Sequence, residues 1–305
     1  MPAVVTAAEA LRRRVARAAR RAAVRPVRRF RGRPPIASRH WPAAPPDFVG
    51  VGAQRSGTSW WYALVESHPG VQTLADATKE LHYFDRYWSE PFTDDDVAAY
   101  ARLFRRPPGR VGGEWTPRYM YDPWTPPILR RAAPDTRLLV LLRDPVDRFV
   151  SAMNHRAARG WRTDASAVGE AVSRGFYHAQ LTRLLAHFPR QQLLVLQFER
   201  CRDDVDTMLQ RTFTFLGLPE ATPSAAGRRP ANQSRPPRSG HAGQPLRSGH
   251  AGQPLRSGHA GRRPPELPRV LLDEIRTCYR ADVDRLASAF PEIDLRLWGR
   301  FSDLG

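Results

Sequence analysis

The chain has 305 residues, of which 41% are hydrophobic and 10% aromatic, so it can bury a sizeable core and is not wholly disordered. Its net charge of +18 would by itself suggest a polyanionic partner, such as nucleic acid or an acidic membrane face. However, residues 1–40 hold twelve arginines and a single acidic residue, Glu9, so +11 of this charge belongs to the N-terminal segment. The rest of the chain has an ordinary charge balance.

The N-terminal segment 1–46 is expected to precede the folded domain. Residues 7–25 have a basic, alanine-rich pattern with little apolar area to bury, which predicts a solvated leader, and a proline-rich linker follows it. Weak contact of residues 1–40 with an anionic membrane surface is the alternative. Specific nucleic-acid binding is not expected, because Phe30 is the only aromatic residue here that could stack on bases.

The sequence also narrows the cellular setting and the use of metals. It contains no run of 18 apolar residues and no apolar core of a secretion signal, which predicts a cytoplasmic chain without a membrane span. Cys201 and Cys278 are too few and too far apart for a disulfide scaffold or a metal-ligand pattern. We therefore expect two reduced, buried thiols and no metal site.

From residue 47 onward, strand-like and helix-like patterns alternate. This alternation predicts an α/β domain over residues 47–305, in which helices flank a central, mostly parallel sheet. Asp144 is expected to cap one helix and Gly217 to end another. Because the apolar run at 137–142 is continuous, this segment is predicted to be a central strand that is buried on both faces. Strands are predicted at 48–52, 137–142 and 193–198, and helices at 58–67, 145–159, 204–216 and 266–290.

Residues 221–265 differ from the rest of the domain. They contain eight prolines and seven glycines in 45 positions, too many for packed regular structure. The nine-residue unit RSGHAGQPL occupies 238–246 and 247–255, and a truncated copy occupies 256–261. Each unit is too short and too polar to stack into a solenoid, so we expect a low-complexity surface loop produced by duplication.

The strongest functional signal is the segment 52–59, Gly-Ala-Gln-Arg-Ser-Gly-Thr-Ser, between the first predicted strand and helix. Its G-x-x-x-x-G spacing is typical of a loop whose backbone N–H groups and following helix hold a phosphate. A nucleoside-triphosphate loop has lysine after the second glycine, where this chain has Thr58. Arg55 supplies the cation instead, and the hydroxyls of Ser56, Thr58 and Ser59 can donate to a phosphate. This pattern favours a nucleotide without a triphosphate and its Mg²⁺.

A second signal begins where the second predicted strand ends. Residues 143–151 read Arg-Asp-Pro-Val-Asp-Arg-Phe-Val-Ser, so Arg143 and Ser151 can converge on one anion. Arg148, Ser151 and His155 are predicted to share one helical face. Together the two segments resemble the 5′-phosphosulfate loop and the R-D-P-x-x-R-x-x-S motif of sulfotransferases that use 3′-phosphoadenosine 5′-phosphosulfate (PAPS).

This resemblance implies a P-loop-like, three-layer fold, PAPS as co-substrate and no metal. It implies that the 5′-phosphosulfate binds to the first segment and the 3′-phosphate to the second. The residues concerned would be Arg55, Ser56, Gly57, Thr58 and Ser59 for the former, and Arg143 and Ser151 for the latter.

A third segment, Lys-Glu-Leu-His-Tyr-Phe-Asp at 79–85, resembles the K-E-x-H-F-F-D sequence of carbohydrate sulfotransferases related to the heparan sulfate enzymes. In those enzymes the glutamate is the catalytic base. The resemblance implies that Glu80 accepts the proton of the acceptor, while Lys79 and Arg55 stabilise charge on the leaving phosphate. His82 is the alternative base, because an imidazole titrates near neutrality and the cytosolic branch of the superfamily uses a histidine.

The resemblance covers roughly residues 47–218. The segment Gly-Glu-Trp-Thr-Pro at 113–117 is similar to the family's E-K-T-P sequence, with Trp115 in place of a lysine that would lie near the acceptor. The family often has a further loop that contacts the 3′-phosphate, and here that loop falls in the repeat region. Its interchangeable candidates are Arg235, Arg238, Arg247, Arg256 and Arg262.

These observations predict a PAPS-dependent sulfotransferase. Its acceptor would be a hydroxyl or amine of a carbohydrate, a glycan or a related small molecule. Two other functions remain open at this point: a P-loop kinase or other nucleotide triphosphatase, and a basic nucleic-acid-binding protein.

Overall fold

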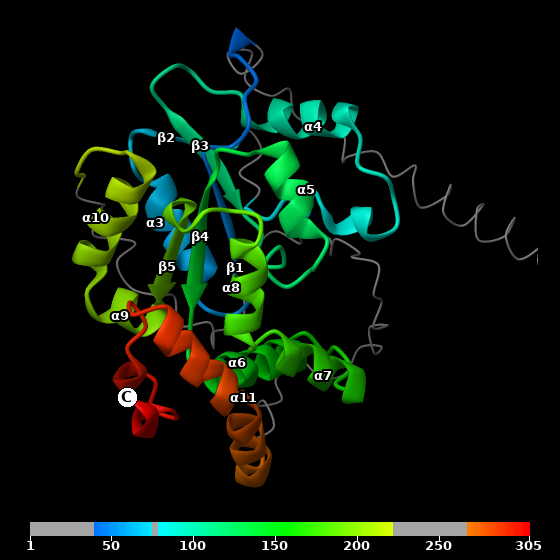
Figure 1. Ribbon diagram of the computed structural model, residues 1–305, viewed down its shortest axis with the longest axis vertical. Coiled ribbons are helices and arrows are strands. Elements are labelled where there is room, and N and C mark those ends of the chain that lie inside the picture. The colour runs from blue at the N-terminus through cyan, green and yellow to red at the C-terminus, as the bar shows by residue number, and fades with distance from the viewer. Residues whose placement is uncertain (1–39, 75–78, 222–266) are drawn as a thin grey trace, which may run out of the picture. The chain divides into compact units, whose positions relative to one another are not determined.

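The computed structural model describes residues 40–74, 79–221 and 267–305 (Figure 1). The strands of this part form one sheet in the order β2-β3-β1-β4-β5, and each neighbouring pair is parallel. The predicted α/β fold with a central parallel sheet is therefore confirmed. The strands are β1 (Phe48–Gly52), β2 (Val71–Gln72), β3 (Val111–Trp115), β4 (Arg137–Leu142) and β5 (Leu193–Gln197).

Helices cover both faces of this sheet. Alternate side chains of the strands enter two separate hydrophobic clusters, because successive residues of a strand point to opposite faces. The described helices are α3 (Thr58–Glu66), α4 (Asp94–Ala101), α5 (Thr125–Ala132), α6 (Pro145–Ala158), α7 (Ala165–Ser173), α8 (Tyr177–Leu185), α9 (Phe198–Asp203), α10 (Val205–Leu216) and α11 (Arg269–Ala289).

The two clusters show which helices lie on which face. Phe48 of β1 and Leu139 of β4 pack with residues of α3 and α10. Val49 and Val140 of the same strands pack with residues of α5, α6, α8 and α11. Both β1 and β4 are thus covered on their two faces, which explains why their sequences are apolar throughout.

The position of β4 differs from the sequence prediction. This strand pairs with β1 on one side and β5 on the other, and β1 is the strand at the centre of the sheet. A continuous apolar run reports that both faces of a strand are covered, but it does not report how many strands lie on each side. Strands β3 and β2 lie on one side of β1, and β4 and β5 lie on the other.

The structure also bears on the expectations for the two cysteines, for a membrane span and for the low-complexity segments. Cys201 is buried as predicted, but Cys278 is exposed on the outer side of α11. Within the described residues, no helix combines the length and the apolar composition needed to cross a bilayer. The predicted leader and the repeat loop, with its five candidate arginines, fall outside the described residues.

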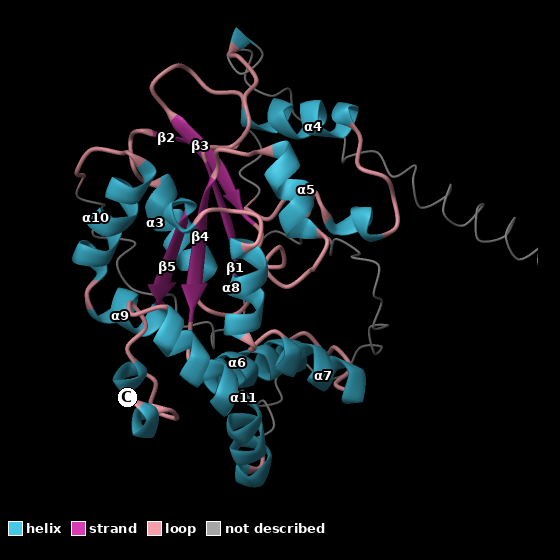
Figure 2. Ribbon diagram, in the orientation of Figure 1, coloured by secondary structure: helices cyan, strands magenta, loops and turns pink. Residues whose placement is uncertain are grey.

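The strand ends define one functional edge of the sheet. In Figure 2 the arrowheads of β4 and β5 point towards α6 and α9, and β1 runs parallel to β4. Asp144 follows β4 and caps α6, since its side chain accepts hydrogen bonds from the backbone N–H groups of Val146 and Asp147. In open parallel sheets, ligands bind outside the carboxyl ends of the strands.

Gly50 provides a test of the packing at the centre of the sheet. A Cβ atom on Gly50 would lie 2.0 Å from the ring of Trp115, so the fully buried indole leaves no room for a side chain. We expect Gly50→Ala to lower the free energy of unfolding by about 1–3 kcal/mol through overpacking, as measured by chemical denaturation. Gly169→Ala is the control, because its Cβ meets nothing within 4 Å in helix α7. That variant should be at least as stable as the wild type, and equal stability of both variants would contradict this packing.

Candidate active site

The loop between β1 and α3 lies at the carboxyl edge of the sheet. The backbone N–H of Ala53 donates to the carbonyl of Leu141 in β4 at 2.9 Å, which holds the loop against the neighbouring strand. Gly57 has φ of 88°, and a Cβ there would lie 2.7 Å from the Phe198 ring, so this position requires glycine. The N-terminus of α3, which begins at Thr58, therefore opens towards the same edge.

The serines of this loop differ in exposure. Ser56 is fully buried, whereas Ser59 is exposed in the first turn of α3. Thr58 is almost buried, but its hydroxyl accepts a hydrogen bond from Lys79 Nζ at 3.1 Å. Thr58 and Ser59 are thus the hydroxyl groups at the start of the helix, and Ser56 is a buried residue of the loop before it.

The two sequence motifs meet directly. Arg55 Nε donates to Ser151 Oγ at 3.3 Å, which joins the loop after β1 to helix α6 after β4. Burial lowers the pKa of Arg55, and the positive charges of Arg143 and Arg159 lower it further. Burial, together with the charges of Arg55 and Arg159, also lowers the pKa of His155 to about 4, so this imidazole is neutral at pH 7. This concentration of positive charge is suited to an anion.

Arg143 and Arg148 of the second motif point in different directions. The Arg143 guanidinium lies 5.2 Å from the centroid of the Phe198 ring, beside the loop. Arg148 is fully buried and donates to the carbonyl of Ala171 in α7, whereas Ser151 is half-buried. Arg148, Ser151 and His155 follow one another along one face of α6, as their spacing predicts, but the Arg148 side chain is buried at the contact between α6 and α7.

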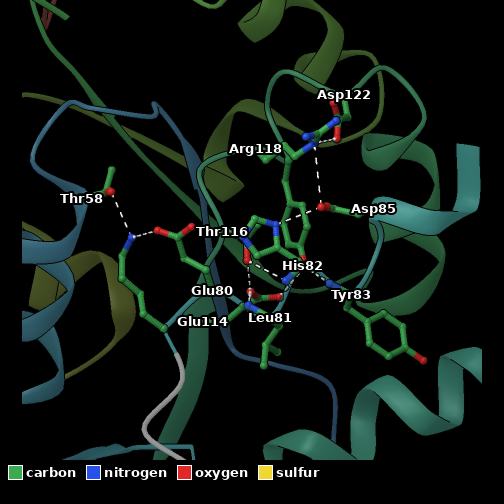
Figure 3. A network of polar contacts seen from close by, with 12 residues as sticks. Thr58, Glu80, Leu81, His82, Tyr83, Asp85, Glu114, Thr116, Arg118 and Asp122 are labelled. Atoms are coloured by element: carbon green, nitrogen blue, oxygen red, sulfur yellow. Dashed lines mark hydrogen bonds and ion pairs between the residues drawn. The ribbon is translucent and has the colours of Figure 1, made fainter. Parts of the chain in front are cut away.

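The third motif forms a row of charged side chains that begins at the loop (Figure 3). Lys79 Nζ donates to Glu80 Oε1 at 2.8 Å as well as to Thr58. The other Glu80 oxygen lies 3.3 Å from His82 Nε2, and His82 Nδ1 lies 3.0 Å from Asp85 Oδ2. The row therefore starts at Lys79, beside the loop between β1 and α3, and continues through Glu80 and His82 to Asp85.

The row has a definite charge pattern. Burial opposes the ionised form of Glu80, but the hydrogen bond from His82 and the charge of Lys79 prevail and lower the pKa of Glu80 to about 2. Burial likewise opposes the charged form of His82, but the hydrogen bonds to Asp85 and Glu80 raise its pKa to about 9. At neutral pH the row consequently alternates between cation and anion, and the imidazolium of His82 has no lone pair free to accept a proton.

Strand β3 holds this row in place. Leu81 N donates to Glu114 Oε2 at 3.3 Å, and Trp115 N donates to the carbonyl of Lys79 at 3.1 Å. Glu114 is fully buried and also accepts hydrogen bonds from three hydroxyl groups. Burial raises the pKa of Glu114, although those donors oppose the shift. The donors are Tyr100, Thr116 and Tyr119.

Trp115, which replaces a lysine of the resembling sequence, does not reach the row. Its indole N–H donates to the carbonyl of Gly52 at 3.2 Å within the sheet. The cation at the far end of the row is Arg118, whose Nε lies 2.6 Å from Asp122 and 3.9 Å from Asp85. In Figure 3 Arg118 lies above His82 and is joined by dashed lines to Asp85 and Asp122, while Thr58 lies at the left of the network.

Several residues of this edge carried no functional expectation from sequence. Asp85 was part of the third motif but had no role, and Arg118 and Arg159 were single arginines among 47. Phe198, at the start of α9, contacts both the Arg143 guanidinium and the Trp60 ring, the latter at a centroid distance of 6.1 Å. The aspartate that follows histidine by three residues is the one signal that could have been used.

Comparison with known proteins identifies the class. The sulfotransferase domain family matches residues 45–281, and the chain belongs to this family of PAPS-dependent enzymes. The predicted activity class is confirmed, and the kinase and nucleic-acid alternatives are not supported. The matched range extends further in both directions than the likeness seen in the sequence.

Individual relatives are distant. Human heparan sulfate glucosamine 3-O-sulfotransferase 3B1 is 28% identical over 190 residues, which cover 57% of this chain and 46% of the relative. Mouse heparan sulfate glucosamine 3-O-sulfotransferase 6 is 29% identical over 198 residues, covering 60% and 56%. The chain thus spans about half the length of these curated relatives. A sulfotransferase crystal structure from Alicyclobacillus acidocaldarius matches with a TM-score of 0.62 and 25% identity, over 84% of this chain and 99% of that one.

The charge row predicts a characteristic dependence of stability on pH. The stabilisation from Glu80 is complete above its unfolded pKa of 4.5 and is lost as pH falls through about 2. That from His82 is complete below its unfolded pKa of 6.5 and is lost as pH rises through about 9. Because both side chains are more than one third exposed, we expect a contribution of about 1 kcal/mol or less.

The measurement is the melting temperature of His82→Gln and the wild type across this pH range. The deficit of the variant should be largest between pH 4.5 and 6.5 and should shrink as pH approaches 9. His187→Gln, on helix α8's C-terminal side and outside the row, is the control and should show no such trend. A deficit that stays constant up to and beyond the upper pKa would contradict the ionic origin of the effect.

Proposed function

We propose that this protein transfers a sulfuryl group from PAPS to a hydroxyl or amine of a carbohydrate or a related small-molecule acceptor. The observation that carries the proposal is the position of Lys79, whose Nζ contacts Thr58 of the loop and Glu80 of the charged row at the same time. One cation therefore links the proposed donor site to the proposed base.

The residues at the carboxyl edge fit a nucleotide with phosphate groups at two places. Arg55, Gly57, Thr58 and Ser59 form one set of cationic, backbone and hydroxyl donors, to which we assign the 5′-phosphosulfate. Arg143 and Ser151 form the other, to which we assign the 3′-phosphate. The hydrogen bond between Arg55 and Ser151 supports a single ligand that spans both sets. Ser56, being buried, is assigned to holding the loop.

PAPS supplies an activated sulfuryl group whose bond to the 5′-phosphate breaks as the acceptor oxygen or nitrogen bonds to sulfur. Glu80 accepts the proton that the acceptor loses, and 3′-phosphoadenosine 5′-phosphate (PAP) leaves. Lys79 and Arg55 stabilise the negative charge that the leaving phosphate gains. The charge row supports this division, because its cation nearest the loop is Lys79 and its next member is Glu80.

The charge pattern supports Glu80 over His82 as the base. His82 lies between two carboxylates, and its raised pKa keeps it protonated at neutral pH. Glu80 is ionised, although its lowered pKa makes it a weak base in the free protein. An anion bound at Thr58 competes for Lys79, and the weakened Lys79–Glu80 pair raises the proton affinity of Glu80 when the donor is present. His82 and Asp85 then orient the Glu80 carboxylate.

The acceptor is proposed from likeness and from the direction of the row. The named relatives are heparan sulfate sulfotransferases, which supports a carbohydrate acceptor. The donor loop lies at the Thr58 end of the row, so the acceptor would approach Glu80 from the side of Asp85 and Arg118.

Removing the base tests the proposed reaction. With labelled PAPS and a set of carbohydrate acceptors, Glu80→Gln should lower turnover by a factor of order 10² to 10⁴ while the dissociation constant for PAP stays near that of the wild type. His82→Gln is the matched variant and should lose less, because it removes an orienting group and not the base. If Glu80→Gln retained wild-type turnover and His82→Gln did not, His82 would be the base.

Removing the cation at the end of β4 tests the donor assignment. Arg143→Ala should weaken PAP binding by about 1.5–3 kcal/mol, because a charged hydrogen-bond partner of the 3′-phosphate is lost. Binding of 5′-AMP, which lacks that phosphate, should change little. Arg137→Ala removes an exposed arginine from the opposite end of the same strand and is the control. Equal weakening of PAP and 5′-AMP in titration calorimetry would overturn the assignment.

A further inference from the structure

The C-terminal segment, residues 294–305, packs against the end of β4, although the two are far apart in the sequence. Trp298 Nε1 donates to Glu199 Oε2 at 2.9 Å, and the other Glu199 oxygen accepts the backbone N–H of Asp144 at 3.1 Å. Trp298 is fully buried, and Glu199 is nearly so. A buried carboxylate thus ties the C-terminal segment to the residue that follows Arg143.

This attachment places Arg300 beside helix α6. The backbone N–H of Arg300 donates to Asp144 Oδ2 at 3.4 Å, and its side-chain Nε lies 3.5 Å from Asp147 Oδ1. The other oxygen of Asp147 lies 4.0 Å from an Arg143 guanidinium nitrogen. Asp147 therefore lies between two arginines, one from the end of β4 and one from the C-terminal segment.

The position of Asp147 poses an electrostatic problem for the proposed donor site. It precedes Ser151 by one helical turn, so both side chains lie on the same side of α6. A 3′-phosphate held by Arg143 and Ser151 would consequently lie close to a carboxylate. Like charges at this range repel, and Asp147 also competes with the phosphate for Arg143.

We propose that Arg300 neutralises Asp147 and thereby keeps Arg143 free for the 3′-phosphate of the donor. On donor binding, Arg143 exchanges the distant Asp147 carboxylate for the phosphate, while Arg300 retains Asp147. Arg300 is then a positioning residue that favours nucleotides with a 3′-phosphate over those without one. This inference rests on the proposed function, since it assumes that Arg143 binds that phosphate.

The Arg300 side chain can be removed while the backbone contacts of this residue remain. Its backbone N–H and carbonyl hold the segment, through Asp144 and Arg276, and alanine retains both groups. The fold of the segment also rests on Trp298 and Glu199, which the substitution leaves unchanged. Arg300→Ala therefore removes the partner of Asp147 without removing the attachment of the C-terminal segment.

The test is a double-mutant cycle of Arg300→Ala and Asp147→Asn, with binding of PAP and 5′-AMP measured by titration calorimetry. Arg300→Ala should weaken PAP binding roughly 5- to 20-fold and change 5′-AMP binding less than about 2-fold, as expected for a partly solvated charge. Asp147→Asn should bind PAP at least as tightly as the wild type. The double variant should also bind PAP about as tightly as the wild type, because the carboxylate that Arg300 neutralises is gone.

The control is Arg296→Ala, which removes an exposed arginine of the same segment that pairs with Asp294. It should leave the binding of both nucleotides unchanged. Equal weakening of PAP and 5′-AMP by Arg300→Ala would overturn the inference, because it would indicate a structural role. A double variant as weak as Arg300→Ala would also overturn it, since Arg300 would then act on the phosphate itself. A wild type that does not distinguish PAP from 5′-AMP would instead overturn the underlying 3′-phosphate assignment.

Discussion

Parallel pairing of β1 with β4 is the constraint on which the candidate active site depends. Because parallel neighbours end at the same edge of a sheet, this pairing brings the loop after Gly52 next to the start of α6. The hydrogen bond from Arg55 to Ser151 is the direct consequence, although 96 residues separate the two. Without that pairing, the two anion-binding segments would be unrelated parts of the chain.

The same edge of the sheet holds several arginines close together, and their like charges repel one another. Burial and neighbouring guanidinium groups already disfavour the charge on Arg55, so the rigid sheet maintains an arrangement that would not form between free side chains. The two carboxylates near these arginines form ion pairs with other side chains as well. Glu80 is paired with Lys79 and His82, and Asp147 lies between Arg143 and Arg300. The site is therefore positive where an anionic donor would bind and balanced where the acceptor would react.

Buried carboxylates connect this edge to the body of the domain. Glu114 joins the 79–83 segment to β3, and Glu199 joins the C-terminal segment to the residue after Arg143. Both are buried, and burial raises the pKa of each, while their hydrogen-bond donors oppose that shift and offset part of the cost of burial. Glu114 and Glu199 therefore help to position residues 79–83 and the start of α6, although they would not themselves contact a substrate.

Local sequence determined much of this protein. The Asp144 cap depends on interactions within a few residues, and the loop glycines, the apolar strands and the segments containing Arg55, Glu80 and Arg143 could be found from their sequence patterns. Only the tertiary structure decided the central position of β1, the inward turn of Trp115 and the burial of Arg148. It alone brought Arg118 and Arg300 to the site. These features depend on which segments pack together, and side-chain direction and sheet order follow from long-range contacts that no short pattern encodes.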